Sequence, residues 1–68
     1  MQYYSNLKKV RKEKGLTQEQ IAEYLGTTRQ QIIKYETGKQ EMTVGRFIKL
    51  ADLYKVSLDH LAGRKFDT

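Results

Sequence analysis

Apolar residues recur along the chain at helical spacing and are interrupted at intervals by glycine, threonine and serine. Leu7 and Val10 lie one turn apart and predict a first amphipathic helix over residues 5–14, which ends at Gly15. No stretch alternates apolar and polar residues with the period of a strand for more than a few positions. The pattern therefore predicts a chain of short helices.

Threonine followed three residues later by glutamine marks the start of the second and third helices. Thr17 and Gln20 form a capping-box pattern, which predicts a helix that ends at the next glycine. The same pattern at Thr28 and Gln31 predicts a helix over residues 29–37. We expect the Gln31 side chain to bond back to the Thr28 backbone rather than to contact a ligand. In the second helix the inward residues should be Ile21, Ala22 and Leu25.

Two more helices are predicted in the second half of the chain. One follows Thr43 and carries an apolar stripe, and a short one follows Ser57. The stripe consists of Val44, Phe47, Leu50, Ala51 and Tyr54. Five short helices joined by tight turns make an all-α domain.

Length and composition limit what such a domain can be. With 68 residues we expect one small domain over residues 1–68, near the lower limit for folding without staples. The chain has no cysteine and His60 is its one histidine, so a disulfide framework or a Cys/His metal cluster is excluded and no cofactor is expected. The carboxylates are scattered and no nucleophile lies beside a base, so an enzyme is not expected.

The sequence carries no signal for a membrane or for export. No apolar run approaches the ~20 residues of a membrane span, and the start, MQYYSNLKK, lacks the apolar segment of a signal peptide. We therefore expect a cytoplasmic protein with no membrane partner.

Positive charge is concentrated in the first part of the chain. The formal net charge is +5 and the pI is about 9.6. Residues 1–39 hold eight basic and four acidic side chains, against five and four in residues 40–68. This distribution favours a polyanionic partner, nucleic acid before a membrane surface. The alternative is a solvated helix face, which fits the lysines of the first helix and its end: Lys8, Lys9, Lys12 and Lys14.

The third helix has an unusual outer face. At about 100° per residue, Thr28, Ile32 and Tyr35 fall on one side of this helix. An ordinary solvated face mixes charges of both signs and seldom exposes a β-branched apolar residue. The outer side here carries no acid and consists of Arg29, Gln30, Ile33, Lys34 and Thr37.

These side chains are of the types that read the major groove of DNA. Arginine donates two hydrogen bonds to guanine, glutamine pairs with adenine, and an apolar group contacts the thymine methyl. The positive end of the helix, together with Arg29, can then face a polyanion. Two helices joined by a short glycine turn, the second bearing such a face, make a helix-turn-helix. The alternative is that Ile33 covers a dimer contact or is a single exposed apolar residue.

Four motifs stand along the chain: R-x-x-K-G-L-T-Q at 11–18, L-G-T-T-R at 25–29, Y-E-x-G-K at 35–39 and L-A-x-x-Y-x-V-S-L-D at 50–59. Together they resemble the lambda repressor/Cro-like (XRE-type) family of bacterial and phage DNA-binding domains. The resemblance covers residues 5–63 and leaves residues 64–68 as a short tail. It implies a compact five-helix, lambda repressor-like fold, with the helix-turn-helix formed by the second and third helices.

The resemblance also implies which residues meet DNA. In the family, the first residues of the third helix meet base edges, and the glutamine that opens the second helix binds a phosphate. Carried onto this chain, the base contacts are Thr28, Arg29, Gln30, Ile33 and Lys34. The phosphate contacts are Gln18, Thr37 and Lys39, with a free solvated lysine as the alternative for the last.

In some members an arginine of the first helix pairs with the acid that ends the third, which matches Arg11 and Glu36. We expect a partly exposed structural ion pair that sets the angle of the third helix and contributes little stability by itself. The chain departs from the family pattern at Met42, where many relatives have proline, and at Arg46, where many have an acid. The loop over residues 38–43 is therefore the part of the chain to which the family's DNA contacts transfer least well.

One such module contacts too few base pairs to select a site in a genome, so we expect a homodimer on an inverted repeat, acting as a repressor. The dimer candidates are Leu58, Leu61 and Phe66, although the two leucines could equally belong to the monomer core. No small-molecule ligand is expected, because the chain leaves no room for a sensing domain. The rival interpretation is a protein-binding module, such as an antitoxin, whose main partner is a protein.

Overall fold

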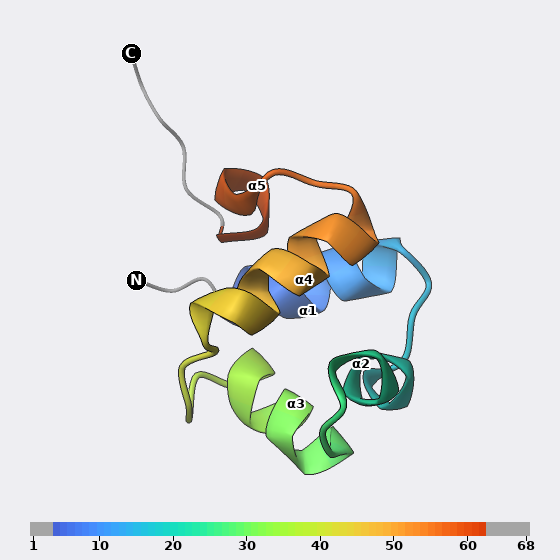
Figure 1. Cartoon of the computed structure of the whole chain (residues 1–68), viewed down its shortest axis with the longest axis vertical. Helices are drawn as coiled ribbons and strands as arrows, with labels where there is room; N and C mark the ends of the chain where they lie inside the picture. Colours follow the sequence, from blue (N-terminus) through green and yellow to red (C-terminus); the bar gives the residue numbers. More distant parts are fainter. Residues whose placement is uncertain (1–3, 63–68) are drawn as a thin grey trace.

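The computed structural model describes residues 4–62, with side chains from residue 6 onward (Figure 1). These residues form five helices and contain no strand. In chain order the helices are α1 (Tyr4–Glu13), α2 (Gln18–Leu25), α3 (Arg29–Glu36), α4 (Val44–Tyr54) and α5 (Leu58–Ala62). The all-α prediction is confirmed, and α1 and α3 lie within one residue of their predicted bounds.

Threonine side chains cap α2 and α3 at the predicted positions. Thr17 Oγ1 accepts from the Gln20 N–H at 3.1 Å, and the Thr17 N–H donates to Gln20 Oε1 at 2.8 Å, which completes a capping box. At α3, Thr28 Oγ1 accepts from the Gln31 N–H at 3.2 Å, but the Gln31 side chain does not return to the Thr28 backbone. That part of the prediction is wrong, because Gln31 lies at the half-buried border of α3 with its Nε2 buried and without a hydrogen-bond partner.

A tight turn at Gly26 joins α2 to α3. Gly26 has a φ of 70°, and the N–H of the next residue, Thr27, donates to the Ala22 carbonyl at 2.9 Å. A Cβ on Gly26 would meet no atom within 4 Å, so the left-handed backbone, rather than a lack of space, favours glycine here. The turn packs α3 against α2 and forms a helix-turn-helix.

The helices are arranged so that α2 and α3 lie together at one end of the molecule and α5 lies at the other (Figure 1). Between them, α4 crosses α1. The first helix contacts both α3 and α5, and α4 also contacts α5. The Asn6 side chain adds polar links between α1 and α5, because its Nδ2 donates to the carbonyls of His60 and Leu61. The helix-turn-helix therefore projects from a scaffold of the remaining three helices.

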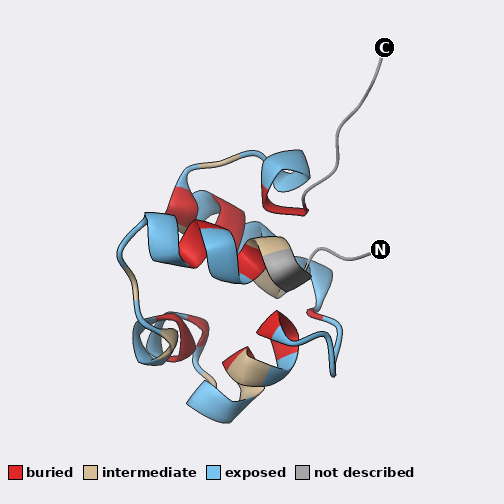
Figure 2. Cartoon of the chain, turned by 180° about the vertical axis from the view of Figure 1, so that it is seen from behind, coloured by how far each residue is buried: buried red, intermediate tan, exposed pale blue. Residues whose placement is uncertain are grey.

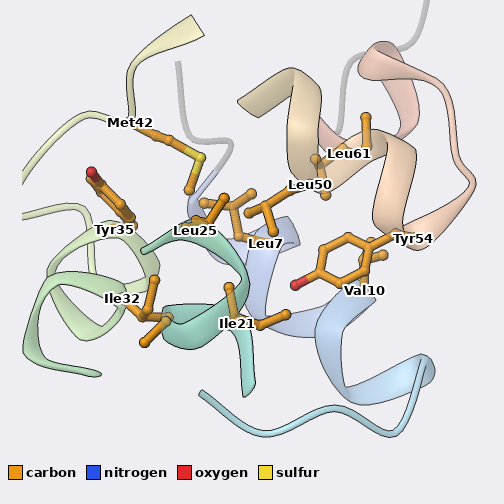
Figure 3. Packing of buried hydrophobic residues seen from close by; sticks show 12 residues of the cluster. Leu7, Val10, Ile21, Leu25, Ile32, Tyr35, Met42, Leu50, Tyr54 and Leu61 are labelled. Atoms are coloured by element: carbon orange, nitrogen blue, oxygen red, sulfur yellow. The ribbon is translucent and has the colours of Figure 1, made fainter. Parts of the chain in front are cut away.

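A single apolar cluster holds these elements together. Figure 3 shows that all five helices contribute side chains to it. The least exposed members are Leu7, Val10, Ile21, Ile32, Leu50, Tyr54 and Leu61. The predicted inward residues of α2 are all buried, which confirms that face. The prediction for Val44 is wrong: this first residue of α4 is 74% exposed, since the helix enters the core only at later turns.

The three candidate dimer residues have different positions. Leu61 is 0% exposed and packs in the core, so it offers no surface for a second copy. Leu58 is 45% exposed and stays a candidate. Phe66 lies outside the described residues.

Lys55 ends α4 in a left-handed conformation, with a φ of 57°, which is unfavourable for a residue that has a Cβ. We predict that Lys55→Gly raises the free energy of unfolding by about 1 kcal/mol, measured by urea denaturation. Lys55→Ala is the control, because it removes the same charge and keeps the Cβ. Equal stabilities of the two variants would contradict the strain.

Candidate nucleic-acid interface

The third helix presents an exposed first turn and a buried last turn. Thr28, Arg29 and Gln30 are exposed at its start, and Lys34 is exposed one turn later. In Figure 2 the start of α3 is coloured as exposed (pale blue), and its end is coloured as buried (red). Ile33, which was predicted to be exposed, is half-buried. The predicted base-contact residues therefore share one side of a helix that points away from the core.

A buried ion pair anchors the last turn of this helix to α1. Arg11 Nε donates to Glu36 Oε2 at 2.6 Å, and Arg11 Nη2 donates to Glu36 Oε1 at 3.1 Å. The Arg11 guanidinium also donates from Nη1 to the Leu16 carbonyl at 2.9 Å. The predicted pair is present, but the expected partial exposure is wrong, because Arg11 is 7% and Glu36 8% exposed. Packing of α1 on α3 closes the pair off from water.

The ion pair continues through Gln18 to the start of α3. Gln18 Nε2 donates to Glu36 Oε1 at 3.1 Å, while its Oε1 accepts from Arg29 Nε at 3.3 Å. One amide therefore contacts a residue at each end of α3. This chain of polar contacts links the exposed Arg29 side chain to the last turn of α3.

The burial of Glu36 also decides the charge of the exposed face. Glu36 is the one acid of α3, and the first turn contains none. Since its carboxylate is bonded to Arg11 and Gln18, it presents no free negative charge beside Arg29 and Lys34. The outer face of α3 is therefore cationic and rich in hydrogen-bond donors.

The segment after α3 places the other predicted phosphate contacts. Thr37 is exposed, and its hydroxyl donates to the Ile33 carbonyl at 2.7 Å, which leaves its oxygen able to accept. Lys39 is exposed beyond the turn at Gly38, where φ is 78°. The Lys39 N–H donates to the Lys34 carbonyl at 3.0 Å, so the backbone of this turn is tied to the end of α3.

A second arginine contacts the end of α3 from α4. Arg46 Nη1 donates to the Tyr35 hydroxyl at 2.7 Å, and Tyr35 is buried. Tyr54, at the end of α4, is buried within electrostatic reach of the Arg11–Glu36 ion pair. Burial raises the pKa of its hydroxyl well above the usual range, the Glu36 carboxylate raises this pKa further, and Arg11 opposes the shift. The Tyr54 hydroxyl is therefore neutral at physiological pH.

An open depression of about 390 Å³ lies where α1 meets the starts of α2 and α3. Arg11, Gln18 and Arg29 line it, and so do Lys8 of α1 and Glu19 of α2. Within residues 4–62, no group of three or more histidine, cysteine or acidic side chains is placed to hold a metal ion. None of the helices in that range is long and apolar enough to cross a membrane.

The fold and this site define a helix-turn-helix domain. The first turn of α3, the second helix of the motif, is exposed, and its last turn is bonded to α1. A family model described as helix-turn-helix matches residues 7–61. The chain belongs to this helix-turn-helix family, of the lambda repressor/Cro-like (XRE) type.

Curated relatives are transcriptional regulators of similar sequence. The chain is 42% identical over 59 residues to the HTH-type transcriptional regulator YqaE of Bacillus subtilis, an alignment that covers 87% of this chain and 51% of the relative. It is 34% identical over 64 residues to the cryptic phage CTXphi transcriptional repressor RstR of Vibrio cholerae, covering 94% and 57%. The chain thus spans about half the length of the curated relatives it matches.

Solved structures with the same fold include two bacterial regulators. A transcriptional regulator from Listeria innocua matches with a TM-score of 0.86 and 31% identity, over 98% of this chain and 63% of that chain. The restriction-modification controller protein C.AhdI from Aeromonas hydrophila matches with a TM-score of 0.78 and 27% identity, over 88% and 91%.

Sequence reasoning missed two charged residues of this region. For Lys8 a solvated helix face was left as the alternative to a basic surface, and no contact was assigned to it, yet it lines the same depression as Arg29. Arg46 was noted only as a departure from the family pattern, yet it bonds to Tyr35. No sequence signal could have found either position, because each depends on how helices distant in sequence pack against one another.

Removal of one partner of a buried ion pair leaves an uncompensated charge in the core. We predict that Arg11→Ala lowers the free energy of unfolding by about 3–5 kcal/mol, measured by urea denaturation. Lys12→Ala, an exposed neighbour on α1, should change it by no more than about 0.5 kcal/mol. If both variants are equally stable, the pair is not the anchor of α3.

Proposed function

We propose that the chain is a sequence-specific, double-stranded DNA-binding transcriptional regulator that enters the major groove with the first turn of α3. The observation that carries the proposal is the exposed, acid-free start of α3, with Arg29 and Gln30 at its tip and the helix's one carboxylate, Glu36, paired inside the protein. A DNA-binding regulator acts beside the chromosome, so the proposal includes a cytoplasmic location.

Base recognition is proposed for the outer side of α3. Arg29 donates to the guanine O6 and N7 atoms, Gln30 pairs with adenine, and Ile33 contacts a thymine methyl. Thr28 and Lys34 complete this set at the two borders of the exposed turn. Because Gln18 holds the Arg29 side chain before DNA arrives, less side-chain freedom is lost on binding.

Phosphate contacts are proposed for Gln18, Thr37 and Lys39, which flank the base-reading turn. Gln18 donates one amide hydrogen to Glu36 and keeps a second for a phosphate oxygen. Such contacts set the register of the protein on the duplex, whereas base contacts supply specificity.

A homodimer on an inverted repeat is proposed because one module reads few base pairs. Two copies would place their third helices in successive major grooves on one face of DNA, about 34 Å apart. Leu58 is the exposed apolar candidate for the contact between copies. Repression is the proposed sign of regulation, which the printed name of the relative RstR supports.

Arg29 and Lys39 should respond differently to substitution. We predict that Arg29→Ala costs about 1–3 kcal/mol on the preferred site and relaxes the preference at one base position. Lys39→Ala should weaken binding to all sequences alike and lower the salt slope by about one. The measurement is the affinity of each variant for the preferred site and for random duplex at several salt concentrations. Equal losses on both DNAs for both variants would contradict the division of roles.

Selection of bound duplexes from a random DNA library at near-physiological salt tests the proposal as a whole. We expect enrichment of an inverted repeat whose half-site centres lie about 34 Å apart. The rival is an antitoxin-like module whose main partner is a protein. An unenriched pool, together with a protein that co-purifies in a stoichiometric amount, would favour that rival.

A further inference from the structure

The phosphate contact proposed for Gln18 falls in the depression between α1 and the starts of α2 and α3, and we infer that Lys8 of α1 contacts the same DNA phosphate. The inference rests on the proposed DNA-binding function and extends the interface from the helix-turn-helix onto α1. Neither the helical pattern nor the family motifs assign a binding role to Lys8.

Polar groups from three helices converge on the depression. Lys8 and Arg11 come from α1, Gln18 opens α2 and Arg29 opens α3. Hydrogen bonds hold three of these groups in place: Arg11 bonds to Glu36 and Leu16, and Gln18 bonds to both Glu36 and Arg29. These contacts fix the shape of the depression before any ligand binds.

Lys8 differs from the other cations of the lining because its charged group is not held by a hydrogen bond or an ion pair within residues 4–62. It is exposed, and no ion pair or hydrogen bond joins its ammonium group to another described residue. Arg11, by contrast, is neutralised by Glu36, and Arg29 is bonded to Gln18. An exposed ammonium can neutralise a DNA phosphate with little desolvation, and it then displaces a cation condensed on the DNA.

The charge of the lining favours an anion, with one opposing group. Lys8, Arg11 and Arg29 are positive, while Glu19 is the carboxylate among the lining residues. The Glu36 carboxylate bonds to Arg11 and offsets the charge of that guanidinium, so Lys8 and Arg29 remain as uncompensated cations against Glu19. The excess is therefore positive, and Glu19 should weaken anion binding at this place.

Helical geometry separates Lys8 from its neighbour Lys9. Arg11 lies three residues after Lys8 and so shares its side of α1. Lys9 is rotated from Lys8 by about 100° in the opposite sense and does not line the depression, although it is also exposed. Lys9 is therefore a control that carries the same charge and is the next residue of the same helix, but lies outside the depression.

The experiment compares Lys8→Ala with Lys9→Ala in the full chain, bound to a random-sequence duplex over a series of KCl concentrations. Lys8→Ala should weaken binding about two- to fivefold at near-physiological salt and reduce the magnitude of the log–log salt slope by about 0.9. Lys9→Ala should leave the slope unchanged. Because both lysines are exposed, both variants should keep the thermal stability of the unaltered protein.

A second experiment removes the negative charge of Glu19 and measures whether binding to DNA becomes tighter. Glu19→Gln should tighten binding to the same duplex, because it removes a negative charge from the lining. Glu23→Gln is the matched control: it lies one turn further along α2 and lines a separate depression with Gln20 and Tyr24. Its effect on affinity should be smaller.

Equal losses of affinity and slope for Lys8→Ala and Lys9→Ala would overturn the inference, because total charge alone would then determine binding. The failure of the proposed function has a different signature. In that case the unaltered protein itself would show no salt-sensitive binding to the duplex.

Discussion

A bidentate ion pair between Arg11 and Glu36 joins α1 to the last turn of α3 inside the protein. Two charges that are 7% and 8% exposed lose most of their hydration, so the pair is stable only if both groups are fully hydrogen-bonded. The contacts to the Leu16 carbonyl and to Gln18 meet this requirement. The position of α3, and with it the direction in which its exposed tip points, depends on this set of bonds.

The same set of bonds separates the charges of α3. With Glu36 bonded inside the protein, the carboxylate that would oppose a polyanion is neutralised, and the exposed turn retains Arg29, Gln30 and Lys34. Gln18 connects the ion pair to the exposed turn, since its amide nitrogen donates to Glu36 and its amide oxygen accepts from Arg29. A hydrophobic replacement of the pair could fill the space equally well, but it would remove the acceptor that holds Gln18 in place.

The remaining helices act as a scaffold for this arrangement. The first helix supplies Arg11 to the ion pair and packs against both α3 and α5, while α4 contributes Tyr54 to the core and the Arg46 contact to Tyr35. Arginines from two different helices therefore bond to neighbouring residues of the last turn of α3. Support of this kind acts on the last turn and leaves Thr28, Arg29 and Gln30 exposed at the start, which a helix that enters a DNA groove requires.

The sequence by itself determined where the helices begin and end, because capping and helical periodicity act between residues three or four positions apart. Thr17 with Gln20, the left-handed turn at Gly26 and the outer side of α3 could all be derived in this way. Family motifs added the pairing of Arg11 with Glu36, but the burial of that pair follows only from the packing of α1 on α3. Tertiary structure also decided that Gln31 leaves its capping box open, that Val44 is exposed and that Lys8 and Arg29 line one depression. These features depend on the angles at which helices distant in sequence pack, and local spacing carries no information about those angles.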